Sequence, residues 1–259
     1  MDIQVLVAAV NQEAIDLCNK LRIKTDVIIS NQCEENSVTK MKYKENDVLY
    51  LNFKERGVGL NRNNAMMRST ADICLIADDD IEYVDNYDEI VKKQFLLYPD
   101  ADIIIFNIIE KKKERYVIKK PFKVNWFNFM RFGAVRIAFR REKIFLHGIS
   151  FNLCFGGGTK HSNGEDTLFL ASCLKEKLNI YAVPVVIASL TEERKSSWFL
   201  GYNDKYFKDK ALLYYLISHR WSYFLCFQDA IRHRKLYYNN GTWIHNIKVM
   251  LNEMKNIKY

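Results

Sequence analysis

Short apolar runs rich in β-branched residues alternate with segments of helical periodicity in the opening part of the chain. The apolar runs predict strands over residues 3–10, 26–30, 48–52, 72–77 and 102–108. Residues 12–21 and 87–98 carry their large apolar side chains at helical spacing. This alternation is typical of a sheet covered by helices, so we expect an α/β fold.

The pattern changes after residue 108. A lysine run over 111–113, Pro121 and an aromatic cluster over 122–132 predict an excursion from the sheet. The rings of that cluster either face a sugar or pack in the core. A further strand is expected over 133–139 and a helix from residue 167 onward. Residues 210–238 are apolar and aromatic with cations at the edges, which fits either packed helices or a helix in a membrane interface.

Composition indicates one large domain with a tail. Of the 259 residues, 49% are hydrophobic, and only 10 are Gly and 3 are Pro, so a flexible linker between independent halves is not expected. We predict a catalytic domain over 1–205 and a helical, aromatic and basic extension over 206–259.

The cysteines and the first residues bear on location. The six cysteines are scattered without a CxxC pair, which fits a reducing cytoplasm. The opening residues predict a first strand, not a signal peptide, and no apolar run is long enough to span a membrane. We therefore expect a cytoplasmic protein, with peripheral attachment to the inner face of the cell membrane as an option.

The most informative polar cluster is the triplet Asp78, Asp79 and Asp80, which directly follows an apolar run. Acidic triplets are common in solvated loops and helix caps, and that interpretation stays open for the triplet alone. At the carboxyl end of a buried strand, however, three carboxylates repel one another unless a cation neutralises them. Hard oxygen ligands select Mg²⁺ or Mn²⁺, so the position favours a metal site that holds nucleotide phosphates.

A second informative segment covers residues 155–169 and contains four of the ten glycines. It ends in Glu165 and Asp166 at the start of a helical pattern. Acidic residues stabilise a helix N-terminus, so capping is one interpretation of this pair and catalysis is the other.

In their order and spacing, the triplet and the later Gly164, Glu165 and Asp166 resemble the two hallmark motifs of family-2 glycosyltransferases. Segments 1–11, 56–63 and 181–184 resemble three further parts of that family, so the resemblance covers roughly residues 1–200. It implies a single domain of the glycosyltransferase A (GT-A) type, a nucleotide-diphospho-sugar transferase-like fold. Its sheet is expected to be mixed and mainly parallel, with flanking helices and a helical C-terminal tail.

The resemblance also implies roles. Asp166 is the implied base that takes a proton from the acceptor hydroxyl, giving inversion, and Glu165 is its close alternative. Asp78 is expected at the ribose or nucleotide, and Asp80 at a Mn²⁺ or Mg²⁺ ion on the diphosphate, as in a DXD motif. The implied donor-binding residues are Val10, Asn11, Asn31, Arg56, Arg62, Asp78 and Asp79, and the implied metal ligands are Asp80 and Asp78. The implied acceptor-side residues are Gly157, Gly158, His161 and Trp198.

Some of these assignments leave alternatives open. Asn31 is followed by Gln32 where many relatives have an aspartate, so recognition of the nucleotide base is not defined. Arg62 fits either a fixed charge near phosphate or an ordinary packing role. No histidine occurs between His161 and His219, so a metal would be held by Asp80, donor phosphates and water.

Together these features predict a metal-dependent inverting glycosyltransferase of surface polysaccharide biosynthesis. It would move a sugar from a nucleotide-diphosphate sugar to a glycan or a lipid-linked saccharide. A sugar-phosphate nucleotidyltransferase is one alternative, although a glycine-rich phosphate loop near the first strand is missing.

A non-catalytic basic module is the other alternative, since the net charge is +8 and basic residues lie away from the triplet. An acidic pocket disfavours a nucleic-acid partner, whereas peripheral contact with an anionic membrane is compatible with the tail.

Overall fold

The computed structural model describes residues 1–110, 116–191, 201–238 and 241–256. The described residues form two compact units. The first unit holds residues 1–153 and 165–191, and the second holds residues 154–164 with the described part of 196–259. The sequence predicts one boundary at residue 205, whereas the structure groups the glycine-rich segment 154–164 with the C-terminal helices.

The first unit is built on a 10-stranded mixed sheet. Its strands are β1 (Ile3–Val10), β2 (Asp26–Gln32), β3 (Ser37–Tyr43), β4 (Asn46–Phe53), β5 (Ile73–Asp78), β6 (Ile81–Tyr83), β7 (Ile103–Ile109), β8 (Phe122–Lys123), β9 (Ile137–Arg140) and β10 (Ile180–Leu190). The order across the sheet is β3-β4-β2-β1-β5-β9-β7-β10-β6, and β8 pairs with β10. Parallel ladders join β1 to β2 and β5, β2 to β4, and β7 to β10. The remaining pairs are antiparallel.

The predicted α/β fold is confirmed, and five predicted strands correspond to β1, β2, β4, β5 and β7. The strand predicted over 133–139 is only partly right, because the chain makes a 3-10 turn at Ala134–Arg136 before β9 begins. That turn directs Arg136 inward, where its guanidinium donates to the carbonyl oxygen of Phe106 at 2.7 Å and to Oδ1 of Asn107 at 2.7 Å. A buried arginine needs such partners, and they outweigh the local preference for a strand.

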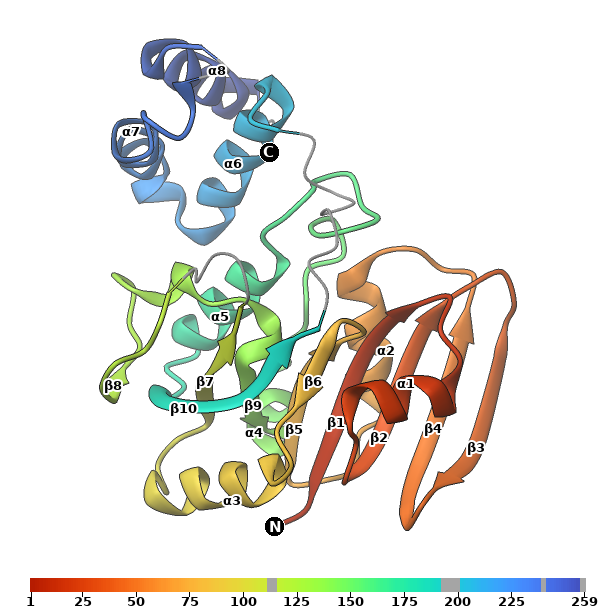
Figure 1. Cartoon of the computed structure of the whole chain (residues 1–259). Helices are drawn as coiled ribbons and strands as arrows, with labels where there is room; N and C mark the ends of the chain where they lie inside the picture. Colours follow the sequence, from red (N-terminus) through yellow and green to blue (C-terminus); the bar gives the residue numbers. More distant parts are fainter. Residues whose placement is uncertain (111–115, 192–200, 239–240, 257–259) are drawn as a thin grey trace. The chain divides into compact units, whose positions relative to one another are not determined.

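Helices cover the sheet of the first unit. They are α1 (Ala14–Leu21), α2 (Val58–Arg68), α3 (Tyr87–Leu97), α4 (Arg141–Leu146) and α5 (Glu165–Lys175). Successive side chains of a strand point to opposite faces, and Val5 and Val7 of β1 share one core cluster with Leu17 of α1 and Val91 of α3. Helix α2 packs against β1 and β2 and lies partly hidden behind the strands in Figure 1, with α1 in front. The central strands β1, β2 and β5 are therefore buried, whereas the edge strand β3 is exposed along most of its length.

The aromatic cluster over 122–132 is buried only in part. Phe129 and Phe132 are buried and support the core-packing interpretation, whereas Phe127 is 94% exposed. The lysine run over 111–113 lies outside the described residues.

The second unit is helical. It contains α6 (Asp204–Ile217), α7 (Ser222–Arg232) and α8 (Trp243–Asn256), which pack against one another, and a 3-10 turn over His219–Trp221 (Figure 1). In the part of the chain that the structure describes, none of the helices combines the length and apolarity that crossing a membrane requires.

Close packing of α2 predicts an effect of substitution at Gly59. A β-carbon at this position would overlap the backbone carbonyl oxygen of Asn152, so even alanine forces the helix away from its neighbour. We expect Gly59→Ala to lower the free energy of unfolding by about 1–3 kcal/mol in a urea titration. Met67→Ala is the control, because Met67 lies on the same helix and is 62% exposed, and it should change stability by less than about 0.5 kcal/mol. Equal stabilities of the two variants would contradict this packing.

Candidate active site

The acidic triplet lies where parallel strands of the first unit end. Ala8 of β1 is paired with Asp78 of β5, so the two strands finish side by side. Just beyond, the backbone N–H of Val10 donates to Oδ2 of Asp79 at 3.3 Å. Ligands of open α/β sheets bind outside the carboxyl ends of the strands, so the predicted position of the triplet is confirmed.

The buried side chain of Asn31, which is 3% exposed, supports the turn after β1. Its Oδ1 accepts from the backbone N–H of Gln12 at 3.1 Å, and its Nδ2 donates to the hydroxyl of Tyr50 at 3.0 Å and to Oδ1 of Asn52 at 2.8 Å. Asn11 lies in this turn with φ of 49°, a left-handed conformation that asparagine tolerates better than most residues. Asn31 therefore stabilises the turn that contains Val10 and Asn11. Its own side-chain amide is engaged in these contacts.

Arg62 joins the two acidic segments. This residue of α2 is 4% exposed, and one terminal nitrogen donates to Oδ1 of Asp78 at 2.8 Å. The other terminal nitrogen donates to Oε1 of Glu165 at 2.8 Å. The charges of Asp78 and Glu165 raise the pKa of Arg62 against the opposing effect of burial. A single guanidinium thus holds together the end of β5 and the start of α5, which are far apart in the sequence.

The residues beside Arg62 anchor α2 in two other directions. Nδ2 of Asn61 donates to the carbonyl oxygen of Ala9 at 3.2 Å. Asn63 forms two hydrogen bonds with the backbone of Phe151, of 2.9 and 2.8 Å. Both asparagines lie in the segment 56–63 that resembles the family, but neither was given a role from the sequence. A run of polar residues within a helix on a buried sheet is a signal that they bind neighbouring segments.

Arg56 lies just before α2 and is more exposed than Arg62. Its side chain donates to the carbonyl oxygen of Cys33 at 3.1 Å and forms an ion pair with Glu34. Gly57, between Arg56 and the helix, donates its N–H to Oε1 of Gln32 at 2.8 Å. Arg56 is thus held at the end of β2, at the same edge of the sheet as the triplet.

Asp166 is partly buried at the start of α5. Its Oδ1 accepts from the backbone N–H of Thr167 at 2.7 Å. Its Oδ2 faces Gly133, where a β-carbon would lie 3.6 Å away, so no side chain at position 133 covers this oxygen. Loss of water around the carboxylate, together with the charge of Glu165, raises the pKa of Asp166 to about 7. Such a group can accept a proton near neutral pH.

The triplet offers partly exposed carboxylates to a divalent cation. Asp79 is 8% exposed, whereas Asp78 and Asp80 on either side of it are partly exposed. Within the described ranges, no three His, Cys, Asp or Glu side chains gather into a group that could hold a metal alone. Mg²⁺ typically uses one or two carboxylates together with substrate phosphates and water, so the pair Asp78 and Asp80 fits an ion that arrives with a phosphate ligand.

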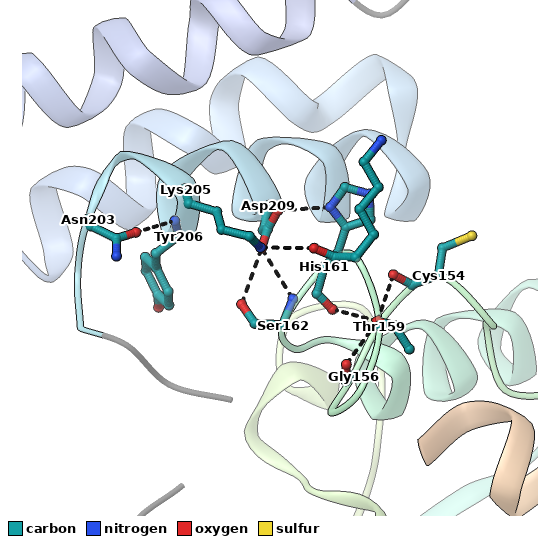
Figure 2. A network of polar contacts seen from close by, with 10 residues as sticks. Cys154, Gly156, Thr159, His161, Ser162, Asn203, Lys205, Tyr206 and Asp209 are labelled. Carbon is teal, nitrogen blue, oxygen red and sulfur yellow. Dashed lines mark hydrogen bonds and ion pairs between the residues drawn. The ribbon is translucent and has the colours of Figure 1, made fainter. Parts of the chain in front are cut away.

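The predicted acceptor-side residues Gly157, Gly158 and His161 belong to the second unit. Figure 2 shows His161 pointing at Asp209 of α6, with 2.8 Å between Nδ1 and Oδ1. The carboxylate of Asp209 also binds Lys205 at 2.7 Å and Ser162 at 3.1 Å (Figure 2). His161 therefore fastens the glycine-rich segment to α6. Trp198, the remaining predicted acceptor-side residue, lies outside the described residues.

The double ion pair predicts a large loss of stability on removing the guanidinium. Arg62→Met leaves two carboxylates facing each other without a cation, and we expect the free energy of unfolding to fall by about 3 kcal/mol. Arg56→Met is the control, because its pair with Glu34 is exposed and worth less than about 1 kcal/mol. Adding Glu165→Gln to Arg62→Met should restore part of the loss. Urea titrations measure all four proteins, and equal losses for the two arginine variants would contradict the assignment.

Comparison with solved structures shows which proteins share this fold. Crystal structures of S. aureus TarS are similar to this chain. Residues 1–349 alone have a TM-score of 0.60 at 12% identity, the UDP-GlcNAc complex 0.63 at 14%, and the UDP complex 0.59 at 12%. In each case 83% of this chain is covered, and the chain spans 65%, 66% and 65% of the length of those three structures. No curated protein matches the sequence.

Structural similarity at 12–14% identity shows the fold alone. A match to a family model also assigns the family. The model described as glycosyl transferase family 2 matches residues 8–156, which is more than half of the 259 residues. The match includes the turn after β1, the helix that carries Arg62 and the acidic triplet. The predicted resemblance is confirmed, and the protein is a glycosyltransferase that belongs to glycosyl transferase family 2.

Proposed function

We propose that this glycosyltransferase moves a sugar from a nucleotide-diphosphate sugar onto a glycan or a lipid-linked saccharide, with inversion at the anomeric carbon and with a divalent cation. The observation that carries the proposal is the contact of Arg62 with both Asp78 and Glu165. Transfer needs a donor site and a base at the same place, and this contact brings the two predicted carboxylate segments together.

Asp166 is the proposed base. Its Oδ1 is fixed by the backbone N–H of Thr167, which leaves Oδ2 to accept the proton of the acceptor hydroxyl. The hydroxyl oxygen then forms a bond to the anomeric carbon as the bond to the diphosphate breaks. Glu165 is engaged by Arg62, so it suits the role of a fixed neighbour whose charge raises the pKa of Asp166.

Asp80 and Asp78 are the proposed metal ligands. When bound, Mn²⁺ or Mg²⁺ would supply positive charge next to the departing diphosphate. Asp78 is held by Arg62 and Asp79 by the N–H of Val10, so the triplet is fixed in position before any donor binds. Fixed ligands of this kind lower the cost of reorganisation during the reaction.

A uridine diphosphate sugar is the proposed donor class, supported by the complexes of S. aureus TarS with UDP-GlcNAc and UDP. The donor-binding residues would be Val10, Asn11 and Arg56 at the strand ends, with Arg62, Asp78 and Asp79 beside them and Asn31 supporting the turn. We place the reaction in the cytoplasm and in surface polysaccharide biosynthesis. All six cysteines lie in the described part of the chain, and none is joined in a disulfide, which agrees with a reducing compartment.

Two matched variants test the division of roles. Asp166→Asn should retain nucleotide binding and lower the transfer rate by about 10²–10⁴-fold, the usual contribution of a positioned base. Asp80→Asn should weaken metal-dependent nucleotide binding. The assay follows products released from a panel of sugar nucleotides with Mn²⁺. Free nucleoside diphosphate supports a transferase. Pyrophosphate formed in a parallel incubation with a nucleoside triphosphate and a sugar 1-phosphate would indicate a nucleotidyltransferase. Normal transfer by Asp166→Asn would move the base role to another residue.

The raised pKa of Asp166 predicts how rate and stability change with pH. The base must be ionised, so kcat/KM should rise with pH up to about 7 and then level off. Stability has the opposite sign, because the native state keeps a proton that the unfolded state has released between about pH 4 and the folded pKa. Stability of the wild type relative to Asp166→Asn should therefore decrease as pH rises through this window. A flat rate profile from pH 5 to 8 would contradict the assignment of Asp166 as the base.

A further inference from the structure

Helix α7 of the second unit places its large apolar side chains on the outside. Its buried positions hold small or polar residues, namely Ser222, Cys226, Asp229 and Ala230. Its exposed positions hold rings and a branched chain: Tyr223 is 51% exposed, Phe224 59%, Phe227 46% and Ile231 42%, with Trp221 just before the helix at 58%. Phe224, Phe227 and Ile231 follow helical spacing and form one stripe. A contiguous exposed apolar patch of this kind marks an interaction site.

A buried carboxylate fixes the rotation of α7. Asp229 is 3% exposed and binds Lys210 of α6 at 2.9 Å. It also accepts from the hydroxyl of Tyr237 at 2.9 Å and pairs with Nδ1 of His233 at 3.0 Å. Burial alone would raise the pKa of Asp229, but His233 and Lys210 hold it well below its usual value. Rotating α7 so that the aromatic stripe faced inward would break this network and leave a charged group without its partners. The stripe therefore stays exposed.

The exposed surface around the stripe is positively charged. Arg220 precedes the helix, Arg232 ends it, and Arg234 and Lys235 follow it, and all four are exposed. From residue 218 to 238, Asp229 is the only acidic residue in the sequence. Because Asp229 is buried and paired, every exposed ionisable group with a fixed charge on this stretch is cationic.

We propose that the face of α7 formed by Trp221, Tyr223, Phe224, Phe227 and Ile231, together with the flanking arginines and lysine, binds the surface of an anionic lipid membrane. Aromatic and branched side chains enter the boundary between headgroups and acyl chains, and the cations bind lipid phosphates. A second copy of the chain is a poorer occupant, because a two-fold contact would bring the same cations face to face. This surface lies outside the proposed catalytic machinery and extends the proposed function, whose lipid-linked acceptor would be found at a membrane.

Flotation of the full chain with vesicles tests the proposal. The protein should float with vesicles of phosphatidylcholine and phosphatidylglycerol in equal parts and remain behind with phosphatidylcholine alone. Each Lys or Arg near an anionic surface contributes roughly 1 kcal/mol, so replacing Arg232 and Lys235 by Gln should weaken binding roughly 30-fold. Added salt should weaken binding of the wild type in the same direction.

The aromatic stripe is tested by a double variant with a matched control. Phe224→Ser with Phe227→Ser should weaken vesicle binding roughly tenfold or more without lowering the thermal midpoint, because both rings are exposed. The control is Leu96→Ser with Leu97→Ser, which removes two apolar side chains of α3 that are 75% and 62% exposed. This control should bind vesicles like the wild type.

Turnover measured without vesicles separates this inference from the proposed function. Absence of vesicle binding by the wild type, or full binding by the Phe224 and Phe227 double variant, overturns the membrane surface even if turnover is normal. Vesicle binding without turnover would leave the membrane surface in place and remove the catalytic proposal. Concentration-dependent dimerisation that the aromatic double variant abolishes, without vesicle binding, would assign the face to a second copy.

Discussion

The ion pairs of Arg62 are the interaction on which the arrangement of the site depends. Asp78 and Glu165 carry like charges and come from segments separated by many residues, so they would not remain close without a cation between them. The guanidinium is planar and presents its donors in a fixed fork, which allows one residue to bind two carboxylates at once. Burying such a charge is costly, and the main return is a single defined geometry.

Helix α2 extends this constraint to the rest of the strand ends. Asn61, Arg62 and Asn63 point in different directions because consecutive residues are spread around a helix, and each binds a different segment of the first unit. Gly59 allows the same helix to lie directly against the backbone at Asn152. A helix that would ordinarily contribute an apolar face instead uses polar contacts to hold the turn after β1, the triplet and the start of α5.

The second unit uses the same principle at Asp229. A buried carboxylate with its partners on neighbouring segments determines which face of α7 is covered and which is left exposed. In both units a buried charge defines an orientation, while the apolar core supplies the bulk of the stability. The exposed faces that result are the proposed reaction site in one unit and the proposed lipid surface in the other.

Local pattern predicted much of the fold and of the candidate site. The apolar runs gave β1, β2, β4, β5 and β7, and the triplet and the Glu165–Asp166 pair were located at a strand end and a helix start, as the structure has them. Strand β3 was missed because it is exposed along most of its length and only Met41 and Tyr43, near its end, pack with the core.

Contacts between distant segments could not be predicted in this way. The pairing of Arg62 with Glu165 spans 103 positions, and no periodicity reports such a contact. The pairing of His161 with Asp209 is of the same kind, and so is the grouping of residues 154–164 with the C-terminal helices. These features depend on tertiary structure, where a charged group selects its partner by proximity after the chain has folded.

The most direct test of the central claim, that the two carboxylate segments form one nucleotide-sugar site, is calorimetric titration of the chain with uridine diphosphate in the presence and absence of Mn²⁺. We expect saturable binding at one site that is much tighter with Mn²⁺ than without it. Absence of binding by uridine diphosphate and by the other nucleoside diphosphates, with and without the metal, would contradict it.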